Sequence, residues 1–284
     1  MEISAYWRCM SGSRGLHISA ISRFGRSACF YSTENYNGSE KSVVIKMGVI
    51  LHGMDVPFYR LSRISNSDAE FGRFRWPDWS LAEPIEFLKI RHEPEDGLPL
   101  RERTQVAALW DERNLYLTFA VFDKGIWATI TTRDARLFHE ECVEFFIDPD
   151  GDGRRYVETQ VNSLGTVRDL LVDGTISHPT PLQYDAMALW RFRALRSEVS
   201  ELNVNHRRVA GWRLQVAIPW VEFDFSHRAW PPQPGDELRI NFYRYERPQS
   251  GIGSLELSGW SCVQGSFHQP GCFGRFIFQS NDDH

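Results

Sequence analysis

From about residue 57 onward, apolar and polar residues alternate with a period of two in short, repeated runs. Successive side chains of a β-strand point to opposite faces of a sheet, so this alternation is typical of strands with one buried face. Turn-forming residues separate the runs, as in WDERN (110–114) and DPDGDG (148–153). The expected strands cover 103–110, 114–123, 142–149, 155–162, 166–172, 190–196, 212–220, 237–246 and 273–278.

Many short strands and little helix predict an all-β fold, an antiparallel β-sandwich of jelly-roll type. Helical signals are few: we expect a turn or short helix over 133–141 and another over 218–223. No internal repeat is visible, which disfavours propellers and solenoids. Because a sandwich can reach about 200 to 250 residues as one unit, we assign residues 57–280 to a single domain.

Residues 1–50 have a different composition. Residues 1–33 contain many serines, four arginines, all within the first 26 positions, and a single acid, Glu2. This bias is typical of an organellar transit peptide, mitochondrial or plastid. The alternatives are a disordered leader or an over-extended gene model whose true start is Met47. If the tail is not a transit peptide, we expect a soluble cytoplasmic protein, and where residues 1–50 are present we expect them to form a disordered N-terminal tail.

Composition excludes several classes of function. With 32 basic and 37 acidic residues the net charge is −5, so the chain lacks the positive excess that binding to nucleic acid requires. The most apolar run, VVIKMGVILHGM, contains Lys46 and His52 and is too short for a transmembrane helix. Five cysteines without a CxxC pair argue against a disulfide framework and a zinc site. GxSxG, P-loop and HExxH motifs are absent. We therefore expect neither nucleic acid nor a membrane as partner.

Several motifs recur in a recognisable order: VAALWDERNLYLTFAVFD, FHEECVEFFIDPDGDGRRYVETQVNSLGTVRDLL, GWRLQVAIPW, PGDELRINFYRYE and FHQPGCFGRFIF. Over about residues 70–279 the chain resembles the carbohydrate-binding module family 9-like domains. The resemblance implies a non-catalytic, saccharide-binding β-sandwich that often carries structural calcium. It also implies an association with polysaccharide catabolism, either alone or attached to a glycoside hydrolase.

The resemblance also implies a binding site. Characterised sugar binders of the family hold the ligand between two aromatic side chains, above polar residues on the strands. Matching the motifs places the aromatic residues at Phe138 and Phe267 and the polar residues at Glu144, Gln160 and Asn162. In the best-known sugar binders both aromatic positions are tryptophan and the position of Gln160 is arginine, so this chain departs from the pattern at three positions.

Strand alternation supports the same site independently. If 142–149 and 155–162 pair through the DPDGDG turn, Glu144 meets Gln160 or Asn162 on one face of the sheet. Aromatic platforms with carboxylate and amide partners suit a ligand that has both C–H faces and hydroxyls. The alternative interpretation is that Glu144 is a solvated strand residue and Phe138 a core residue.

The turn between these two strands is a candidate metal site. Asp148, Asp150 and Asp152 supply oxygen ligands at alternating positions, an arrangement that suits calcium. The glutamate that completes an EF-hand loop is missing, and Asp and Gly are also common in hairpin turns for backbone reasons. Both interpretations stay open, and any calcium bound here is expected to be structural.

Three functions follow from the sequence. The leading prediction is carbohydrate binding without catalysis. The second is glycoside hydrolysis, which needs two acids across the scissile bond, here Glu144 and a second acid such as Glu140 or Glu141. The third is a structural or interaction domain that has lost sugar binding.

Overall fold

The structure is a computed structural model, and it describes residues 56–65, 74–89, 100–176, 179–247, 255–261, 263 and 266–280. Contacts between Cα atoms divide the chain into Met1–Asp55 and Val56–His284, and the fold described below is that of the second unit. The transit-like segment predicted over 1–50 lies outside the described residues. Among the helices that the structure describes, none has the length and apolar character needed to cross a membrane.

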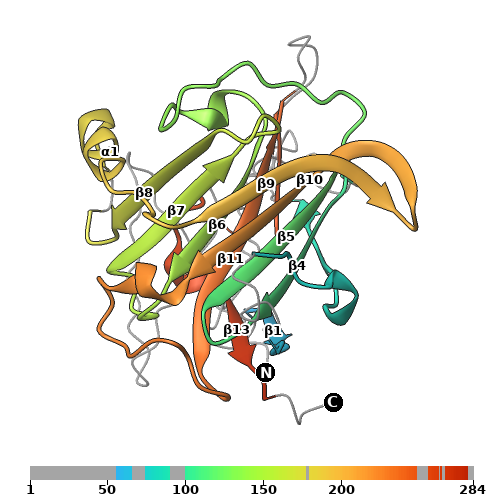
Figure 1. Ribbon diagram of the computed structural model, residues 1–284. Coiled ribbons are helices and arrows are strands. Elements are labelled where there is room, and N and C mark those ends of the chain that lie inside the picture. The colour runs from blue at the N-terminus through green and yellow to red at the C-terminus, as the bar shows by residue number, and fades with distance from the viewer. Residues whose placement is uncertain are drawn as a thin grey trace, which may run out of the picture. The chain divides into compact units, whose positions relative to one another are not determined.

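Two β-sheets form the fold (Figure 1). The larger sheet contains, in order, β1 (Phe58–Leu61), β13 (Gly274–Phe278), β11 (Glu237–Glu246), β6 (Cys142–Asp148), β7 (Arg155–Val161) and β8 (Val167–Asp173). It is extended beside β11 by β12 (Glu256–Gly259) and β3 (Leu88–Lys89). The smaller sheet contains β2 (Ile85–Glu86), β4 (Thr104–Trp110), β5 (Asn114–Phe122), β10 (Arg207–Pro219) and β9 (Arg196–Val204). The predicted all-β sandwich is confirmed.

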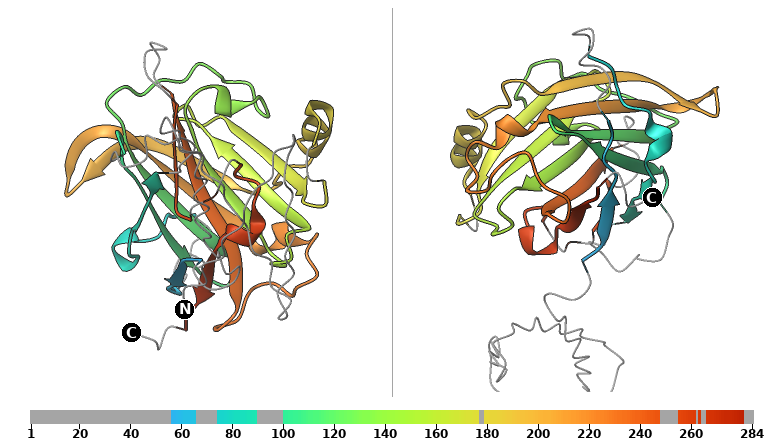
Figure 2. Two further views of the ribbon diagram at one scale, coloured as in Figure 1. Left: turned by 180° about the vertical axis from the view of Figure 1, so that it is seen from behind. Right: turned by 60° about the horizontal axis from the view of Figure 1, so that its bottom comes forward.

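Most neighbouring strands are antiparallel, with one exception at the edge of the larger sheet. β1 runs parallel to β13, with Phe58 opposite Arg275 and Leu61 opposite Phe278. Figure 2 shows β1 in blue beside β13 in red. The first and last strands of the described fold are therefore neighbours.

The core fills the space between the two sheets. In β6 the inward-facing residues Val143, Phe145 and Ile147 pack with residues of the smaller sheet such as Leu117 and Phe119. All five have no exposed surface, and burying side chains of this size contributes about 1.5 to 3 kcal/mol each. The alternation read from the sequence therefore assigns the inner face of β6 correctly.

The outer face of the larger sheet carries a second apolar cluster. Phe146, Tyr156 and Leu170 come from β6, β7 and β8, and they pack with Phe267 and Phe273 from the chain that follows β12. This sheet is therefore covered on both faces, by the smaller sheet on one side and by loop residues on the other. The same outer face holds the candidate site.

Short helices lie at the edges of the sandwich. The turns predicted at 133–141 and 218–223 contain the 3-10 helices η3 (Leu137–His139) and η4 (Trp220–Phe223). An α-helix that the sequence analysis did not predict, α1 (Pro181–Met187), lies beside β8 (Figure 1). Two further 3-10 helices in the described part of the chain are η2 (Trp79–Leu81) and η5 (Pro270–Cys272).

The strand predicted over 190–196 is wrong, because strand β9 begins only at Arg196. The backbone N–H groups of Arg193 and Ala194 donate to the buried carboxylate of Glu222, at 3.0 and 2.8 Å. Since a side chain satisfies these amides, the segment needs no strand partner to bury them.

Candidate functional site

A cavity of about 360 Å³ lies on the outer face of the larger sheet. Strands β6, β7 and β8 provide its base, and residues of η3, β11, α1 and the C-terminal segment surround it. The lining residues are Arg136, Phe138, Glu144, Phe146, Glu158, Gln160, Arg168, Pro179, Pro181, Tyr184, Tyr245, Leu257, Ser266, Phe267 and His268. Four of the five predicted ligand-binding residues are among them.

Strand register places the polar residues of the cavity in one row. Glu144 of β6 lies opposite Gln160 of β7, and Gln160 lies opposite Arg168 of β8. Glu158, two residues before Gln160, shares the same face because strand side chains alternate. We call Glu144, Glu158, Gln160 and Arg168 the polar floor of the cavity. Each of these residues is at most 5% exposed.

Three buried atoms of the polar floor have no hydrogen-bond partner within the described structure: Glu158 Oε2, Gln160 Oε1 and Arg168 Nε. The remaining groups are held in place, because Gln160 Nε2 donates to Glu158 Oε1 at 2.7 Å and an Arg168 Nη1–H donates to the Asp134 carbonyl at 2.6 Å. A buried polar atom without a partner costs about 1 to 3 kcal/mol. A ligand that supplies two donors and an acceptor would remove that cost.

Two carboxyl groups dominate the electrostatics of the polar floor. Burial, followed by the charge of Glu158, raises the pKa of Glu144 well above its ordinary value. The thiol of Cys142, 3.8 Å from Glu144 Oε1, opposes this shift only in part. Two carboxyls that share one site cannot easily both ionise. A proton is therefore held more firmly by Glu144 than by an exposed glutamate.

Aromatic rings stand over the polar floor. Phe138 is half-buried, and its ring centroid lies 6.1 Å from that of Tyr245. Tyr245 in turn lies 5.2 Å from Phe267. Phe267 is only 5% exposed, because its ring stacks on Tyr243 at 4.0 Å with an angle of 4° between the planes. One face of Phe267 is thus covered, and the half-buried Tyr245 contacts both predicted rings.

Asn162 lies outside the cavity. It follows the last residue of β7, and its side chain closes the turn to β8. Its Oδ1 accepts from the N–H groups of Leu164 and Thr166 at 3.1 and 3.0 Å, and its Nδ2 donates to the Ile130 carbonyl at 2.8 Å. Alternation places Asn162 on the correct face, but the end of the strand turns it away from the other four predicted residues.

The three predicted metal ligands in the DPDGDG turn serve other partners. Asp148 accepts from the N–H groups of Gly151 and Gly153 at 2.9 and 2.8 Å. Asp150 accepts from the Ser226 hydroxyl at 2.9 Å, and Asp152 from the Arg154 N–H at 2.9 Å. The structure does not gather these carboxylates around one point, so its geometry is that of a hydrogen-bonded turn.

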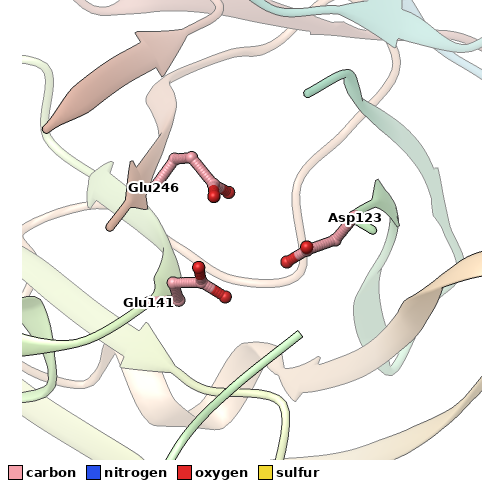
Figure 3. A group of neighbouring side chains, drawn as sticks. All are labelled: Asp123, Glu141 and Glu246. Carbon is pink, nitrogen blue, oxygen red and sulfur yellow. The ribbon is translucent and has the colours of Figure 1, made fainter. Parts of the chain in front are cut away.

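Among the described residues, one group of three carboxylates is arranged to share a cation: Asp123, Glu141 and Glu246 (Figure 3). One oxygen from each lies within 4.8 Å of the others, and all three residues are buried. Oxygen ligands at such spacing suit calcium. Burial, together with the charges of Glu246 and Asp123, raises the pKa of Glu141 to about 9. The guanidinium of Arg244 also pairs with Asp123, at 3.1 Å, and with Glu246.

Sequence reasoning missed several residues of the cavity. Glu158 lies on the face that alternation had already identified, and extending the alternation to the next strand would have added Arg168. Tyr184 and His268 carry no comparable signal. They reach the cavity from α1 and from the segment before β13, whose positions depend on tertiary packing.

A comparison with protein families finds that the model of carbohydrate-binding family 9 matches residues 99–278. This range contains the whole polar floor and every aromatic residue that lines the cavity. No curated protein matches the chain.

Solved structures with the same fold include a protein from Bacteroides uniformis proposed to bind carbohydrate. It has a TM-score of 0.57 and 18% identity, and the match covers 78% of this chain and 99% of that one. A family 9 module from Caldicellulosiruptor kristjanssonii in complex with cellotriose has a TM-score of 0.50 and 14% identity, over 80% and 95% of the two chains. Its complex with glucose has a TM-score of 0.51 and 15% identity, over 80% and 98%. At these identities the likeness shows the fold alone.

Proposed function

The chain belongs to carbohydrate-binding family 9, and from this membership we propose that it holds its saccharide in the cavity on the outer face of the larger sheet. Membership makes the protein a non-catalytic carbohydrate-binding module. The polar floor is the observation that supports this location of the sugar. Its buried residues Glu158, Gln160 and Arg168 each present an atom without a hydrogen-bond partner in the described structure.

The cavity suits the two kinds of surface that a sugar has. Hydroxyl groups both donate and accept, so they can donate to Glu158 Oε2 and Gln160 Oε1 and accept from Arg168 Nε. Phe138 and Tyr245 offer ring surface to the C–H face of the sugar. In this proposal Arg168, one strand further along, supplies the guanidinium that the best-known binders carry at the position of Gln160.

The related structures support a small ligand, because the Caldicellulosiruptor module was solved with glucose and with cellotriose. A cavity of about 360 Å³ is near the lower end of the range for small-molecule sites. We therefore propose that one or two sugar units enter the cavity of this protein.

Isothermal titration calorimetry with a panel of mono- and oligosaccharides tests the proposal. Phe138→Ala and Arg168→Met are each expected to weaken binding at least about ten-fold, since each removes more than about 1.4 kcal/mol of contact. Leu189→Ala, which trims a large side chain that is 80% exposed and does not line the cavity, is the control. Wild-type affinity in a folded Phe138→Ala or Arg168→Met variant would place the sugar elsewhere.

Hydrolysis is the second candidate because the cavity does contain two acids, Glu144 and Glu158. Both rise from the same face of one sheet, whereas glycosidases place their two carboxyls on either side of the scissile bond. We propose that this pair binds and does not cleave. Release of chromophore from a nitrophenyl glycoside, lost in Glu144→Gln, would show the opposite.

We also propose that the structural calcium expected from the family binds at Asp123, Glu141 and Glu246. Asp123 follows β5 of the smaller sheet, whereas Glu141 directly precedes β6 and Glu246 ends β11 in the larger sheet. A cation held there would link the two sheets.

Partnership with a glycoside hydrolase, a role in polysaccharide catabolism and import into an organelle remain proposals from the sequence.

A further inference from the structure

The polar floor contains more acid than a neutral sugar requires. Glu144 and Glu158 both line the cavity and belong to adjacent strands. Glu144 lies opposite Gln160, and Glu158 lies opposite Phe146, so the two glutamates are diagonal neighbours. Diagonal neighbours of this kind lie within reach of long side chains. Glu144 and Glu158 are 1% and 5% exposed, so water screens their charges only weakly.

The nearby cations form no hydrogen bond with Glu158 Oε2 in the described structure. Arg136 pairs with Asp185 at 3.1 Å, and Arg168 lies 4.0 Å from the same carboxylate while its Nη1–H donates to the Asp134 carbonyl. His268 Nε2 lies 3.5 Å from Glu158 Oε2, beyond ordinary hydrogen-bond length. The cavity therefore contains Glu158 Oε2 as a buried anionic acceptor that no donor in the described structure satisfies.

The groups around the cavity register this negative charge. After burial, the charge of Glu158 is the next cause that raises the pKa of Tyr156 and of Tyr184. Likewise, the charge of Glu144 is the next cause, after burial, that raises the pKa of Tyr245 and of Cys142. Four groups from different elements thus face the two carboxyl groups of the cavity closely enough to respond to their charge.

We propose that the cavity selects a saccharide with a free, protonated amino group, an amino sugar, over its neutral and N-acetylated counterparts. The inference rests on the proposed function, because it assigns the class of ligand to the same site.

An ammonium group matches the unmet demands of the polar floor. It has three donors and a positive charge, so it can donate to Glu158 Oε2 and to Gln160 Oε1 and also face Glu144. Charge-assisted hydrogen bonds of this type are about twice as strong as neutral ones. Acetylation removes the charge and leaves one N–H donor on a bulkier group. The hydroxyls of the sugar remain available to accept from Arg168 Nε.

Calorimetry on the full chain tests this, with glucosamine, glucose and N-acetylglucosamine at about pH 6, where an amine is protonated. We expect glucosamine to bind at least about ten-fold more tightly than glucose, equivalent to about 1.4 kcal/mol, and N-acetylglucosamine to bind no better than glucose. Glucosamine binding that equals or falls below glucose binding would overturn the inference and leave the proposed function intact. A uronic acid that binds more tightly than glucosamine would overturn it too.

Variants separate charge from shape. Glu158→Gln keeps the size of the side chain but removes the charge, so the ratio of glucosamine to glucose affinity is expected to fall towards one. Glu201→Gln removes a carboxylate that is 61% exposed on the other sheet and should leave that ratio at its wild-type value. An unchanged ratio in Glu158→Gln contradicts the role of Glu158. If no sugar of any class binds to the folded wild type, the proposed function itself fails.

Discussion

Asp169 is a carboxylic acid without exposed surface on the core-facing side of β8. It pairs with the guanidinium of Arg133, which is 40% exposed. Burial is the larger influence, and it raises the pKa of Asp169 from 3.8 to about 6 in spite of that pair. The folded protein thus binds a proton at this residue more strongly than the unfolded chain does.

This shift predicts a pH dependence of stability. Because the folded pKa lies above the unfolded one, the contribution of Asp169 to stability is full below about pH 4 and is lost as the pH rises to about 6. Asp169→Asn removes the titration. We therefore expect the variant to gain roughly 3 kcal/mol relative to wild type over this range.

Urea unfolding of both proteins at several pH values measures the difference. Glu112→Gln, at a side chain that is 75% exposed, is the control and should show no such trend. A constant difference between Asp169→Asn and wild type from about pH 4 to 6 would mean that Asp169 does not titrate there.

At this scale the sequence predicted residues whose position depends on strand alternation. Glu144 and Gln160 meet on one face because their strands pair through a tight turn, which is a local arrangement. Tyr245 and His268 are placed by pairing and packing between segments about a hundred residues apart. The sequence alone carries no signal for such contacts.

Among the strands, β10 needs a glycine at position 211 to pack closely against β5. The pairing of β10 with β9 shifts register between Arg208 and Trp212. Gly211 lies in this irregularity with φ of 139°, and a Cβ at its position would be 2.1 Å from the carbonyl oxygen of Val121 on β5. A side chain there meets both backbone strain and a rigid neighbour.

We expect Gly211→Ala to lower the free energy of unfolding by at least about 2 kcal/mol. Gly125→Ala is a matched control, since nothing lies within 4 Å of its Cβ position and the change in the unfolded chain is the same. Denaturant titrations of the two variants give the comparison. Equal stabilities would show that β10 and β5 adjust their spacing without cost.

Strands bounded by clear turns were predicted to within a residue or two, as β6 and β11 illustrate. The helix α1 was missed, although it starts with a local signal: Thr180, Pro181 and Gln183 form a capping box with proline in the first turn. Strand β9 was missed for a different reason. Six of its nine residues are exposed and only one is buried, so burial imposes little pattern on its sequence.

At the scale of the whole molecule, the carboxylates Asp123, Glu141 and Glu246 connect the two sheets. With a pKa of about 9 for Glu141, a cation must displace a proton to bind there, so its affinity should increase as the pH rises towards 9. We expect millimolar calcium to raise the Tm, and more strongly at about pH 8 than at about pH 6.

Glu141→Gln should abolish this increase, as differential scanning calorimetry with calcium and with a chelator can show. Asp148→Asn distinguishes the alternative site, because its own effect on stability should be independent of calcium. If calcium stabilises Glu141→Gln but not Asp148→Asn, the cation binds in the DPDGDG turn, as the sequence first suggested.

The parallel pairing of β1 with β13 has a mechanical consequence. Phe58 begins the first strand and Phe278 ends the last, and the two strands point the same way. Tension between these two points would load the β1–β13 hydrogen bonds in shear, all together, and could not unzip them one after another. A protein held at Phe58 and pulled at Phe278 should therefore resist extension most strongly at this edge.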